Sequence, residues 1–463
     1  MRRFLILVAV LLPLWGFSQE FVGQWGGTFS VNDTRLTLVF HIQHQDDAYV
    51  AQFDSPDQNA MGLKVDRVRV EGHEICLEMN QIKASYQGAL VSKGMIMGTF
   101  MQGGLKFPVI LTPHEYVYPQ RPQEPLPPYP YTEQEVEFAS RDEGVTLHGT
   151  LTLPEGKPLA VVVMVTGSGM QNRDEELFGH KPFKVIADRL TREGVAVLRY
   201  DDRGWGASKE ETAALTYTTT HHLTLDALGA VDYLRGLEQL RNVPIGALGH
   251  SEGGTIAFRM AAKDRHVKFI ISMAGSMLRG DRVLQFQIRR QLLQMGLPMD
   301  TTDQCVAYRQ MILDHLRTHS LEDLQTNAVS YKAQLKASPL GATIPNTLRT
   351  GMLQIYDAVV KSPWLHNFIQ YNPTKDIIIA GRRPILSLNG MLDSQVEAGE
   401  HQGRLKLLAQ KSKRLTVKTY DNLNHLFQPC KTGLVNEYSK IDTTISEEVL
   451  QDIVTWIHEL YAK

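Results

Sequence analysis

The sequence predicts an α/β protein with a mostly parallel sheet, preceded by a smaller antiparallel β domain. From about residue 134 onward, short continuous apolar runs, typical of parallel strands covered on both faces, alternate with amphipathic helical patterns. Residues 20 to about 112 instead carry short alternating segments separated by Asp, Asn, Gly and Ser turns, which is typical of antiparallel strands. At 463 residues, the chain is also too long for one ordinary core and indicates more than one domain.

The first eighteen residues have the pattern of a secretory signal. Arg2 and Arg3 form a basic start, residues 4–14 an apolar segment, and residues 16–18 a small-x-small cleavage site. The apolar segment is short for a membrane span, and no cysteine follows it to carry a lipid anchor. We therefore expect a mature protein that begins at Gln19, has no stable membrane anchor and works in the periplasm or outside the cell.

The region 19–112 is predicted to be the N-terminal β domain. Its alternating segments lie at 36–43, 48–53 and 64–70, and glycine-containing segments lie at 23–27 and 97–100. The last two are interpreted as the first and last strands of a small barrel or sandwich. The Gly-Trp start resembles that of lipocalin-like barrels. A scaffold for the following domain is favoured over a module that docks substrate or glycan.

Prolines crowd the stretch 113–133, which is predicted to be an extended, semi-rigid linker. The α/β domain then covers 134–463. Its apolar runs predict strands at 134–140, 145–153, 160–165, 194–199, 243–248, 268–274, 384–389 and 415–420. Helical patterns lie at 181–193, 221–236, 252–264, 395–411 and 445–460. The helix-rich stretch of about 276–380 interrupts this regular order, and we predict that it is a lid.

The most informative motif is Gly-His-Ser-Glu-Gly at 249–253, between a predicted strand and a predicted helix. A serine on such a tight turn is held in strained backbone with its hydroxyl exposed at the carboxyl end of the strand. The alternative is an ordinary turn between a strand and a helix. The strand, the additional glycine Gly254 and the helix favour a nucleophile at Ser251.

A serine nucleophile needs a base, and the base needs an orienting acid. Asp393 lies in the loop after the predicted strand 384–389, and His425 lies just after the strand 415–420. These positions favour Asp393 as the acid and His425 as the base. The alternatives are a helix N-cap for Asp393, a loop histidine without a catalytic role, and Asp421 as the acid.

The developing oxyanion needs hydrogen-bond donors. The strand 160–165 ends in Thr-Gly-Ser-Gly, and glycine lets the backbone come close to the nucleophile. The backbone amides of Ser168 and Glu252 are the expected donors, with Gly167 and Gly169 beside the pocket. A glycine-rich turn without a catalytic role is the alternative, and the spacing of a dinucleotide-binding loop is not completed.

Other residues have two interpretations each. Trp364, Phe368 and Tyr371 are candidates for an apolar acyl pocket, although aromatic residues at such positions are more often lid core. Asp202 and Arg203 are interpreted as a structural ion pair rather than as a substrate clamp. The polar segment 171–176 lines the mouth of the pocket or is a solvated loop.

Together these motifs identify a resemblance. Residues from about 134 to 463 resemble an α/β-hydrolase of the branch that includes prolyl-oligopeptidase-like and dienelactone-hydrolase-like enzymes. The motifs are Val-Thr-Gly-Ser-Gly at 165–169, Tyr-Asp-Asp-Arg-Gly-Trp-Gly-Ala-Ser at 200–208, Gly-His-Ser-Glu-Gly-Gly at 249–254, Asp393 and His425. Glu252 departs from the aromatic or apolar residue that many relatives carry after the nucleophile. Its side chain either tunes the pocket or forms a helix-start carboxylate.

The resemblance implies acyl transfer to water through an acyl-enzyme on Ser251, Asp393 and His425, with a small-molecule ester as the substrate. The nearest rival is a serine exopeptidase of the same fold, and a rival of another class is a non-catalytic, hydrolase-shaped binding protein. Against the peptidase, the N-terminal region is too short for the large propeller of related dipeptide-releasing enzymes.

Composition restricts the remaining classes. Apolar residues make up 43% and charged residues 21%, as in a globular protein, and a net charge of −2 argues against a general nucleic-acid binder. The Cys and His spacings imply no metal, and no cofactor is expected. The three cysteines leave a Cys305–Cys430 disulfide open, and the oligomeric state is not predicted.

Overall fold

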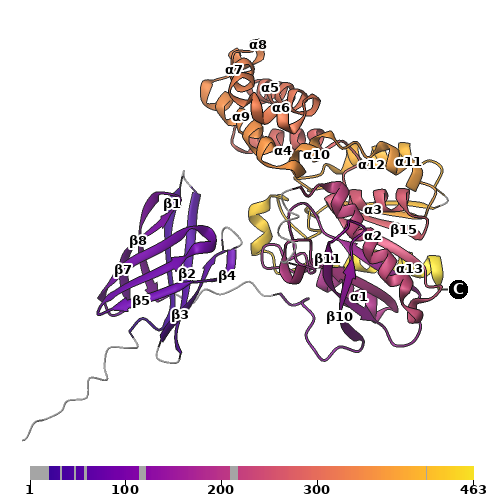
Figure 1. Cartoon of the computed structure of the whole chain (residues 1–463), viewed down its shortest axis with the longest axis horizontal. Coiled ribbons are helices and arrows are strands. Elements are labelled where there is room, and N and C mark those ends of the chain that lie inside the picture. Colours follow the sequence, from indigo (N-terminus) through magenta and orange to yellow (C-terminus); the bar gives the residue numbers. More distant parts are fainter. Residues whose placement is uncertain are drawn as a thin grey trace, which may run out of the picture. The chain divides into compact units, whose positions relative to one another are not determined.

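The computed structural model describes residues 20–31, 34–45, 48–56, 60–113, 121–208, 217–412 and 414–462. The chain divides into two compact units, Met1–Gln120 and Arg121–Lys463 (Figure 1). The predicted signal segment 1–18 lies outside the described residues. Within the described ranges, no helix combines the length and the apolar character that a membrane crossing requires.

The first unit is one antiparallel sheet in the order β4-β3-β2-β1-β9-β8-β7-β6-β5. Its strands are β1 (Gly23–Val31), β2 (Thr34–Gln45), β3 (Ala48–Ser55), β4 (Ala60–Lys64), β5 (Arg67–Glu71), β6 (Glu74–Met79), β7 (Ala84–Ser92), β8 (Met95–Gln102) and β9 (Leu105–Pro113). The two edge strands, β4 and β5, are consecutive in the chain. Between them the Val65 N–H donates to Ala51 O at 3.2 Å, and the Asp66 N–H donates to Glu78 O at 2.7 Å. The connection between β4 and β5 therefore joins the two edges of the sheet, which is curled and has an up-and-down topology.

The last strand differs from the prediction. Residues 97–100 belong to β8, and the final strand is β9, which pairs with β8 along its length and with β1 at Trp25 and Gly26. Pro108 within β9 argues against a strand in the sequence, because proline cannot donate to a ladder. The partners of β1 on β9 are Pro113 and Thr112, so Pro108 lies away from this pairing.

The interior of the curled sheet is packed with aromatic side chains. Phe40, Phe53, Tyr86 and Phe100 are buried in one cluster, with ring centroids 5.1 Å apart for Phe40 and Phe53. The Tyr86 hydroxyl is shared between Ile96 O at 3.3 Å and Val109 O at 3.2 Å. Because a buried hydroxyl without a partner is costly, these contacts fix Tyr86 within the core.

The second unit contains an eight-stranded sheet in the order β10-β11-β13-β12-β14-β15-β16-β17, parallel from β13 onward. Its strands are β10 (Thr132–Ala139), β11 (Thr146–Leu153), β12 (Ala160–Val165), β13 (Val195–Tyr200), β14 (Ile245–His250), β15 (Val267–Met273), β16 (Ile385–Gly390) and β17 (Leu415–Tyr420). Each predicted strand of this unit is present, with its ends moved by at most two residues.

Helices cover both faces of this sheet. They are α1 (Pro182–Arg192), α2 (Thr220–Gly236), α3 (Glu252–Lys263), α11 (Thr374–Ala380), α12 (Ala398–Leu408) and α13 (Glu447–Tyr461). Val161, Val163 and Val165 of β12 pack in the cluster with α2, α3, α11 and α12. Ala160, Val162 and Met164 pack in the cluster with α1 and α13. A strand that is buried on both faces explains its continuous apolar run, and the predicted fold class is confirmed.

The predicted lid region contains helices between β15 and β16, drawn in orange in Figure 1. They are α4 (Gly280–Gln294), α5 (Met299–Thr318), α6 (Leu321–Thr326), α7 (Ala328–Lys336), α8 (Pro339–Ala342), α9 (Asn346–Lys361) and α10 (Pro363–Gln370). These helices share a core of their own that includes Cys305, Tyr308 and Tyr356. By contrast, α11 packs on the sheet through Ile377 and Ala380, so the separate helical layer ends with α10.

The three cysteines are free in the structure, so no disulfide joins Cys305 to Cys430. The second half of the predicted linker also has a definite position. Residues 121–131, which we call the strap, pack on the α/β unit. Arg121 donates to the carbonyl groups of Gly179, Phe178, Ser439 and Ile441 at 3.0–3.1 Å. The linker that remains between the two units is therefore shorter than 113–133.

Candidate active site

The Gly-His-Ser-Glu-Gly segment forms a sharp turn between β14 and α3. Ser251 has φ 54° and ψ −118°, a conformation that is costly for a residue with a side chain. The flanking glycines are required sterically. A Cβ atom on Gly249 would lie 2.0 Å from Gly253 O, and one on Gly253 would lie 2.0 Å from Val165 O. Backbone packing therefore holds Ser251 in the strained conformation.

Asp393 and His425 form a buried pair. The Asp393 Oδ2 atom lies 2.7 Å from His425 Nδ1, and both side chains are at most 4% exposed. Asp393 Oδ1 accepts hydrogen bonds from the backbone amides of Gln395 at 2.7 Å and Val396 at 2.8 Å. The Asp393 carboxylate is thus fixed by its own loop and holds the imidazole of His425. Asp421, the alternative acid, is exposed.

One cavity of about 340 Å³ contains Ser251 and His425 in its wall. Gly167, Ser168, Glu252, Trp364 and Phe368 also line it. The apolar side chains of Val283 and Leu284, from α4, form a further part of the wall. The structure therefore brings most of the predicted site residues together.

Two predicted pocket residues are not among those that line the cavity. Gly169 has φ 100° and lies between the lining residues Ser168 and Gln171 without lining the cavity itself. Tyr371 follows α10; its hydroxyl donates to Asp376 at 2.7 Å, and its ring packs against the Arg259 guanidinium. Tyr371 therefore connects the helical layer to α11 and α3 instead of contacting the cavity.

The expected oxyanion donors lie at the edge of this cavity. Glu252 is the first residue of α3, so its N–H belongs to the unpaired first turn of a helix. The neighbouring amide of Gly167 is already used, because it donates to Glu175 Oε1 at 2.8 Å. This contact holds the segment 167–168, which we call the oxyanion loop, against the segment 171–176.

The Glu252 side chain joins three parts of the molecule. Its carboxylate accepts hydrogen bonds from the Thr220 hydroxyl at 2.6 Å, the Ser168 hydroxyl at 3.0 Å and the Trp364 indole N–H at 3.1 Å. These donors belong to α2, the oxyanion loop and α10. Burial raises the pKa of Glu252 above its ordinary value. Of the two interpretations of Glu252, the one in which its side chain shapes the pocket agrees with these contacts.

His250 and Glu175 form a second buried acid–histidine pair beside Ser251. His250 Nδ1 lies 2.9 Å from Glu175 Oε1, and His250 Nε2 lies 2.9 Å from His425 O. Burial lowers the pKa of His250, but the Glu175 carboxylate, the carbonyl group of His425 and the Asp393 carboxylate together outweigh burial and raise that pKa. The sequence did not single out His250, although it lies in the 249–253 motif directly before Ser251. Glu175 lies in the segment 171–176, which one of the two interpretations placed at the mouth of the pocket, but its pairing with His250 was not predicted.

Asp202 and Arg203 are both buried, but they do not pair with each other. Arg203 is bidentate with Asp226 at 2.5 and 2.7 Å and also reaches Asp142 at 2.7 Å. Asp202 instead accepts hydrogen bonds from the Thr166 hydroxyl and the Gln171 amide. The structural interpretation agrees with this arrangement, while the expected ion-pair partner was wrong.

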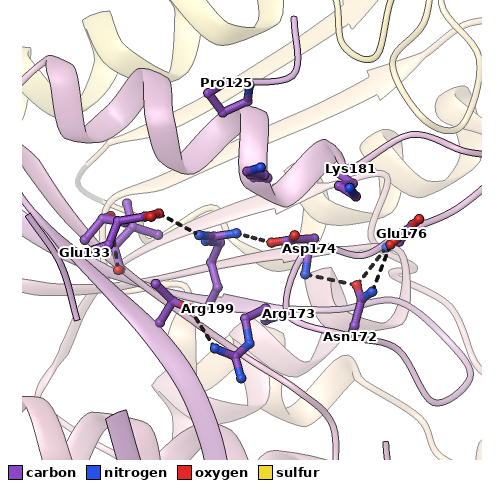
Figure 2. A network of polar contacts seen from close by, with 12 residues as sticks. Pro125, Glu133, Asn172, Arg173, Asp174, Glu176, Lys181 and Arg199 are labelled. Carbon is purple, nitrogen blue, oxygen red and sulfur yellow. Dashed lines mark hydrogen bonds and ion pairs between the residues drawn. The ribbon is translucent and has the colours of Figure 1, made fainter. Parts of the chain in front are cut away.

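The segment 171–176 is neither purely pocket wall nor purely solvated. Gln171 and Glu175 line the cavity. Figure 2 shows how its other side chains are anchored: Arg199 lies between Asp174 and Glu133, and Asn172 contacts Glu176. Arg173 pairs with Asp201 at 2.9 Å. Ion pairs on the outer side thus fix the segment that carries Glu175 into the site.

Comparisons with known proteins match parts of the second unit. Residues 157–340 match a hydrolase family model described as serine aminopeptidase, S33. Esterase EstD of Thermotoga maritima is 35% identical over 130 residues, which cover 28% of this chain and 30% of that protein. The chain spans about a third of the length of the curated relatives it matches.

Solved structures also match the chain. An esterase of Pyrococcus furiosus matches with a TM-score of 0.43 and 15% identity, covering 76% of this chain and 100% of that one. A dienelactone hydrolase of Anabaena variabilis matches with a TM-score of 0.39 and 16% identity, covering 72% and 99%.

Proposed function

We propose that this chain, which is an α/β-hydrolase, cleaves carboxylic esters by acyl transfer to water at Ser251. The observation that carries the proposal is the strained serine turn in the wall of one cavity with the buried His425–Asp393 pair. The esterase name of the relative from Thermotoga maritima supports the choice of esters.

In the proposed first step, Ser251 Oγ attacks the ester carbonyl carbon while His425 takes the hydroxyl proton. The carbonyl oxygen becomes an oxyanion, which accepts hydrogen bonds from the amides of Glu252 and Ser168. His425 then gives its proton to the alcohol oxygen, the carbon–oxygen bond breaks, and an acyl-enzyme remains. Asp393 keeps the imidazole in the required orientation and stabilises its protonated form.

In the proposed second step, water replaces the alcohol. His425 takes a proton from the water, whose oxygen attacks the acyl carbon, and the same amides hold the new oxyanion. The bond to Ser251 Oγ then breaks, Oγ receives the proton back, and the carboxylic acid leaves. Each cycle consumes one water molecule and no cofactor.

The cavity favours small substrates with an apolar acyl part. Its volume of about 340 Å³ is near the lower end of the usual range for ligand pockets, about 300–1,000 Å³. Val283, Leu284, Trp364 and Phe368 supply apolar wall. We therefore propose short acyl esters, including acylated sugars or plant-derived esters, as the substrate class.

A hydrolysis screen tests the proposal. Model 4-nitrophenyl esters of graded acyl length, acetylated and feruloylated sugars, and aminoacyl anilides would be compared on one preparation, with Ser251→Ala as the blank. We expect a higher kcat/KM for short acyl esters than for any anilide, because an ester has the better leaving group.

The second candidate is a serine exopeptidase, which the description of the matching family model favours. A higher kcat/KM for anilides than for esters, abolished in Ser251→Ala, would establish that candidate. An inert protein with a correctly folded site would instead favour the non-catalytic binding role.

We also propose that residues 1–18 direct export and are removed. The support is their basic start, apolar middle and small-x-small end. Mass spectrometry of the protein isolated from the periplasm or medium should give Gln19 as the first residue. Recovery of Met1 in the cytoplasmic fraction would reject the proposal.

A further inference from the structure

We propose that Glu175 and His250 are positioning residues, which hold the oxyanion loop and the loop of the catalytic base together only while a proton lies between them. The inference rests on the proposed acyl transfer at Ser251. It assigns a role to a buried pair that the proposed mechanism does not use. Neither residue is proposed to contact the reacting atoms.

The contacts of the His250 ring determine how many hydrogens it needs. The carbonyl oxygen of His425 can only accept a hydrogen bond, so His250 Nε2, 2.9 Å away, carries a hydrogen. On the other side of the ring, His250 Nδ1 lies 2.9 Å from Glu175 Oε1. That contact requires one hydrogen, on the ring nitrogen or on the carboxyl oxygen.

A neutral imidazole beside an ionised carboxylate has one hydrogen too few. If its hydrogen is on Nε2, the lone pair of Nδ1 faces the Glu175 carboxylate. If the hydrogen is on Nδ1, the lone pair of Nε2 faces the carbonyl of His425. Either state loses one of two buried hydrogen bonds. The observed geometry therefore contains one additional proton, shared by Glu175 and His250.

The Glu175–His250 pair connects three segments of the site. Glu175 Oε1 also accepts the Gly167 amide at 2.8 Å, so the same oxygen holds the oxyanion loop. His250 Nε2 holds the backbone of His425. His250 itself is the last residue of β14, directly before the nucleophile. The proposed acyl transfer requires these three segments to be correctly placed relative to one another.

The Glu175 carboxylate is held rigidly by its own turn. Glu175 has φ 51°, an uncommon conformation for a residue with a side chain. Its N–H donates to Asn172 O at 2.9 Å, and Asn172 Oδ1 accepts the amides of Asp174 and Glu176 at 3.1 Å. The ion pairs in Figure 2 anchor this turn from outside. The turn therefore presents Glu175 to the site in one fixed position.

The charged and titratable neighbours of Glu175 and His250 determine in which direction of pH the shared proton is lost. Asp393 faces His250 from the loop after β16, and the His425 ring lies 4.7 Å from the His250 ring between centroids. Asp202 faces Glu175 from the turn after β13. The carboxylates of Glu175 and Asp393 and the carbonyl group of His425 favour the protonated ring, and together they raise the pKa of His250 although burial lowers it. Because that pKa is raised, the pair keeps its proton at low pH and loses it as pH rises through the raised value.

The activity test compares two variants of one loop. Glu175→Gln places either an oxygen or a nitrogen where Oε1 lies, so it cannot satisfy both the Gly167 amide and a neutral His250. Glu176→Gln makes the same chemical change at an exposed position and is the matched control. We expect Glu175→Gln to lose about tenfold or more in kcat on 4-nitrophenyl acetate, with KM little changed. In the wild type, kcat/KM should fall at alkaline pH, and this fall should begin at lower pH in Glu175→Gln.

A second measurement does not depend on turnover. The His250 ring in ¹⁵N-histidine-labelled protein, assigned with His250→Gln, should titrate above the ordinary histidine pKa of about 6.5 and shift downward in Glu175→Gln. If Glu175→Gln fails to fold, Glu175→Asp is measured in its place. This variant retains a carboxylate, so the pKa of His250 should remain raised.

The outcomes separate the two proposals. A His250 ring that titrates at or below about 6.5, or a pH profile of Glu175→Gln equal to that of Glu176→Gln, overturns the positioning role. A wild-type protein that hydrolyses no ester and reacts with no serine-directed phosphonate rejects the proposed function, while the histidine titration still decides the shared proton.

Discussion

At Ser251 the backbone conformation itself is a consequence of the neighbouring glycines, which leave no room for any other side chain at 249 and 253. The serine is therefore placed by packing, and its reactivity is expected to come from His425 and Asp393. Ser251→Ala and His425→Ala should each lower kcat on a reactive ester by several orders of magnitude, because the three residues act as one unit. Steady-state kinetics on folded variants, verified by circular dichroism, measures this.

The assignment of Asp393 as the acid can be tested with Asp421 as the control. Asp393→Asn should lower kcat by about 10⁴-fold, because an amide favours the wrong tautomer of His425. Asp421→Asn, at an exposed position nearby in sequence, should retain nearly normal kcat. If Asp421→Asn is the inactive variant, the acid is Asp421 and the assignment of Asp393 is wrong.

Arg203 is expected to matter for stability and not for substrate binding. It is fully buried and pairs with Asp226 and Asp142. Arg203→Ala leaves these carboxylates without their cation and should lower the free energy of unfolding by about 3–5 kcal/mol. Urea denaturation measures the loss, and the KM of the remaining folded enzyme should be normal. A raised KM at unchanged stability would favour the substrate-clamp interpretation.

The sequence predicted residues whose role follows from their place at a strand end. Ser251, Asp393 and His425 each follow an apolar run, and parallel strands bring such positions to one edge of a sheet. Glu175 could not be found in this way. It lies in a polar loop, has positive φ, and meets His250 at a separation of 75 residues. The assignment of Tyr371 to the pocket was wrong for a different reason. An aromatic residue near a predicted lid fits the wall of a pocket and the core of the lid equally well.

At the scale of the elements, α10 is connected to the site by a hydrogen bond. Its Trp364 donates to Glu252, whose carboxylate also binds the oxyanion loop through Ser168. Trp364→Phe removes the N–H and leaves the buried carboxylate with one donor fewer, at a cost of about 1–3 kcal/mol. We expect a raised KM with little change in kcat, measured over a full substrate range. An unchanged KM would mean that α10 contributes no binding energy through this contact.

Glu252→Gln is the companion variant. The oxygen of its side-chain amide can still accept a hydrogen bond from Trp364, but the side chain carries no charge. Burial raises the pKa of Glu252, so the wild-type carboxyl becomes ionised only as pH rises through the raised value. An ionised carboxylate in the cavity opposes the developing oxyanion. The kcat of Glu252→Gln relative to wild type should therefore increase with pH, and a ratio that falls with pH would contradict this expectation.

The strands of the second unit were predictable from their short continuous apolar runs, and the helices α1, α2, α3, α12 and α13 from their helical apolar patterns. The curled sheet was predicted less completely, since β9 contains Pro108 and its pairing with β1 is long-range. The extent of the helical layer was also uncertain in the sequence. Ile377 and Ala380 of α11 carry an apolar pattern that fits either the layer or the sheet.

At the scale of the whole molecule, the boundary between the two units lies before the strap. Residues 121–463 should fold alone and keep esterase activity on a small soluble ester. The shorter fragment 132–463 lacks the strap and should unfold at lower temperature, because the carbonyl groups bound by Arg121 and the Asp188 carboxylate bound by Tyr131 lose their donors. Equal melting temperatures would show that the strap contributes nothing. A folded but inactive 121–463 would give the N-terminal unit a part in catalysis.

The strap also sets an order of events during synthesis. Arg121 leaves the ribosome early, yet its acceptor at Ser439 follows 318 residues later. At roughly 5–20 residues per second, the two are separated by tens of seconds of translation. For that interval the guanidinium lacks the carbonyl acceptors of Ser439 and Ile441, and His425 is absent for nearly as long. A ribosome-bound chain therefore remains without the expected chemical centre until its last strand, β17, and the loop that carries His425 have emerged.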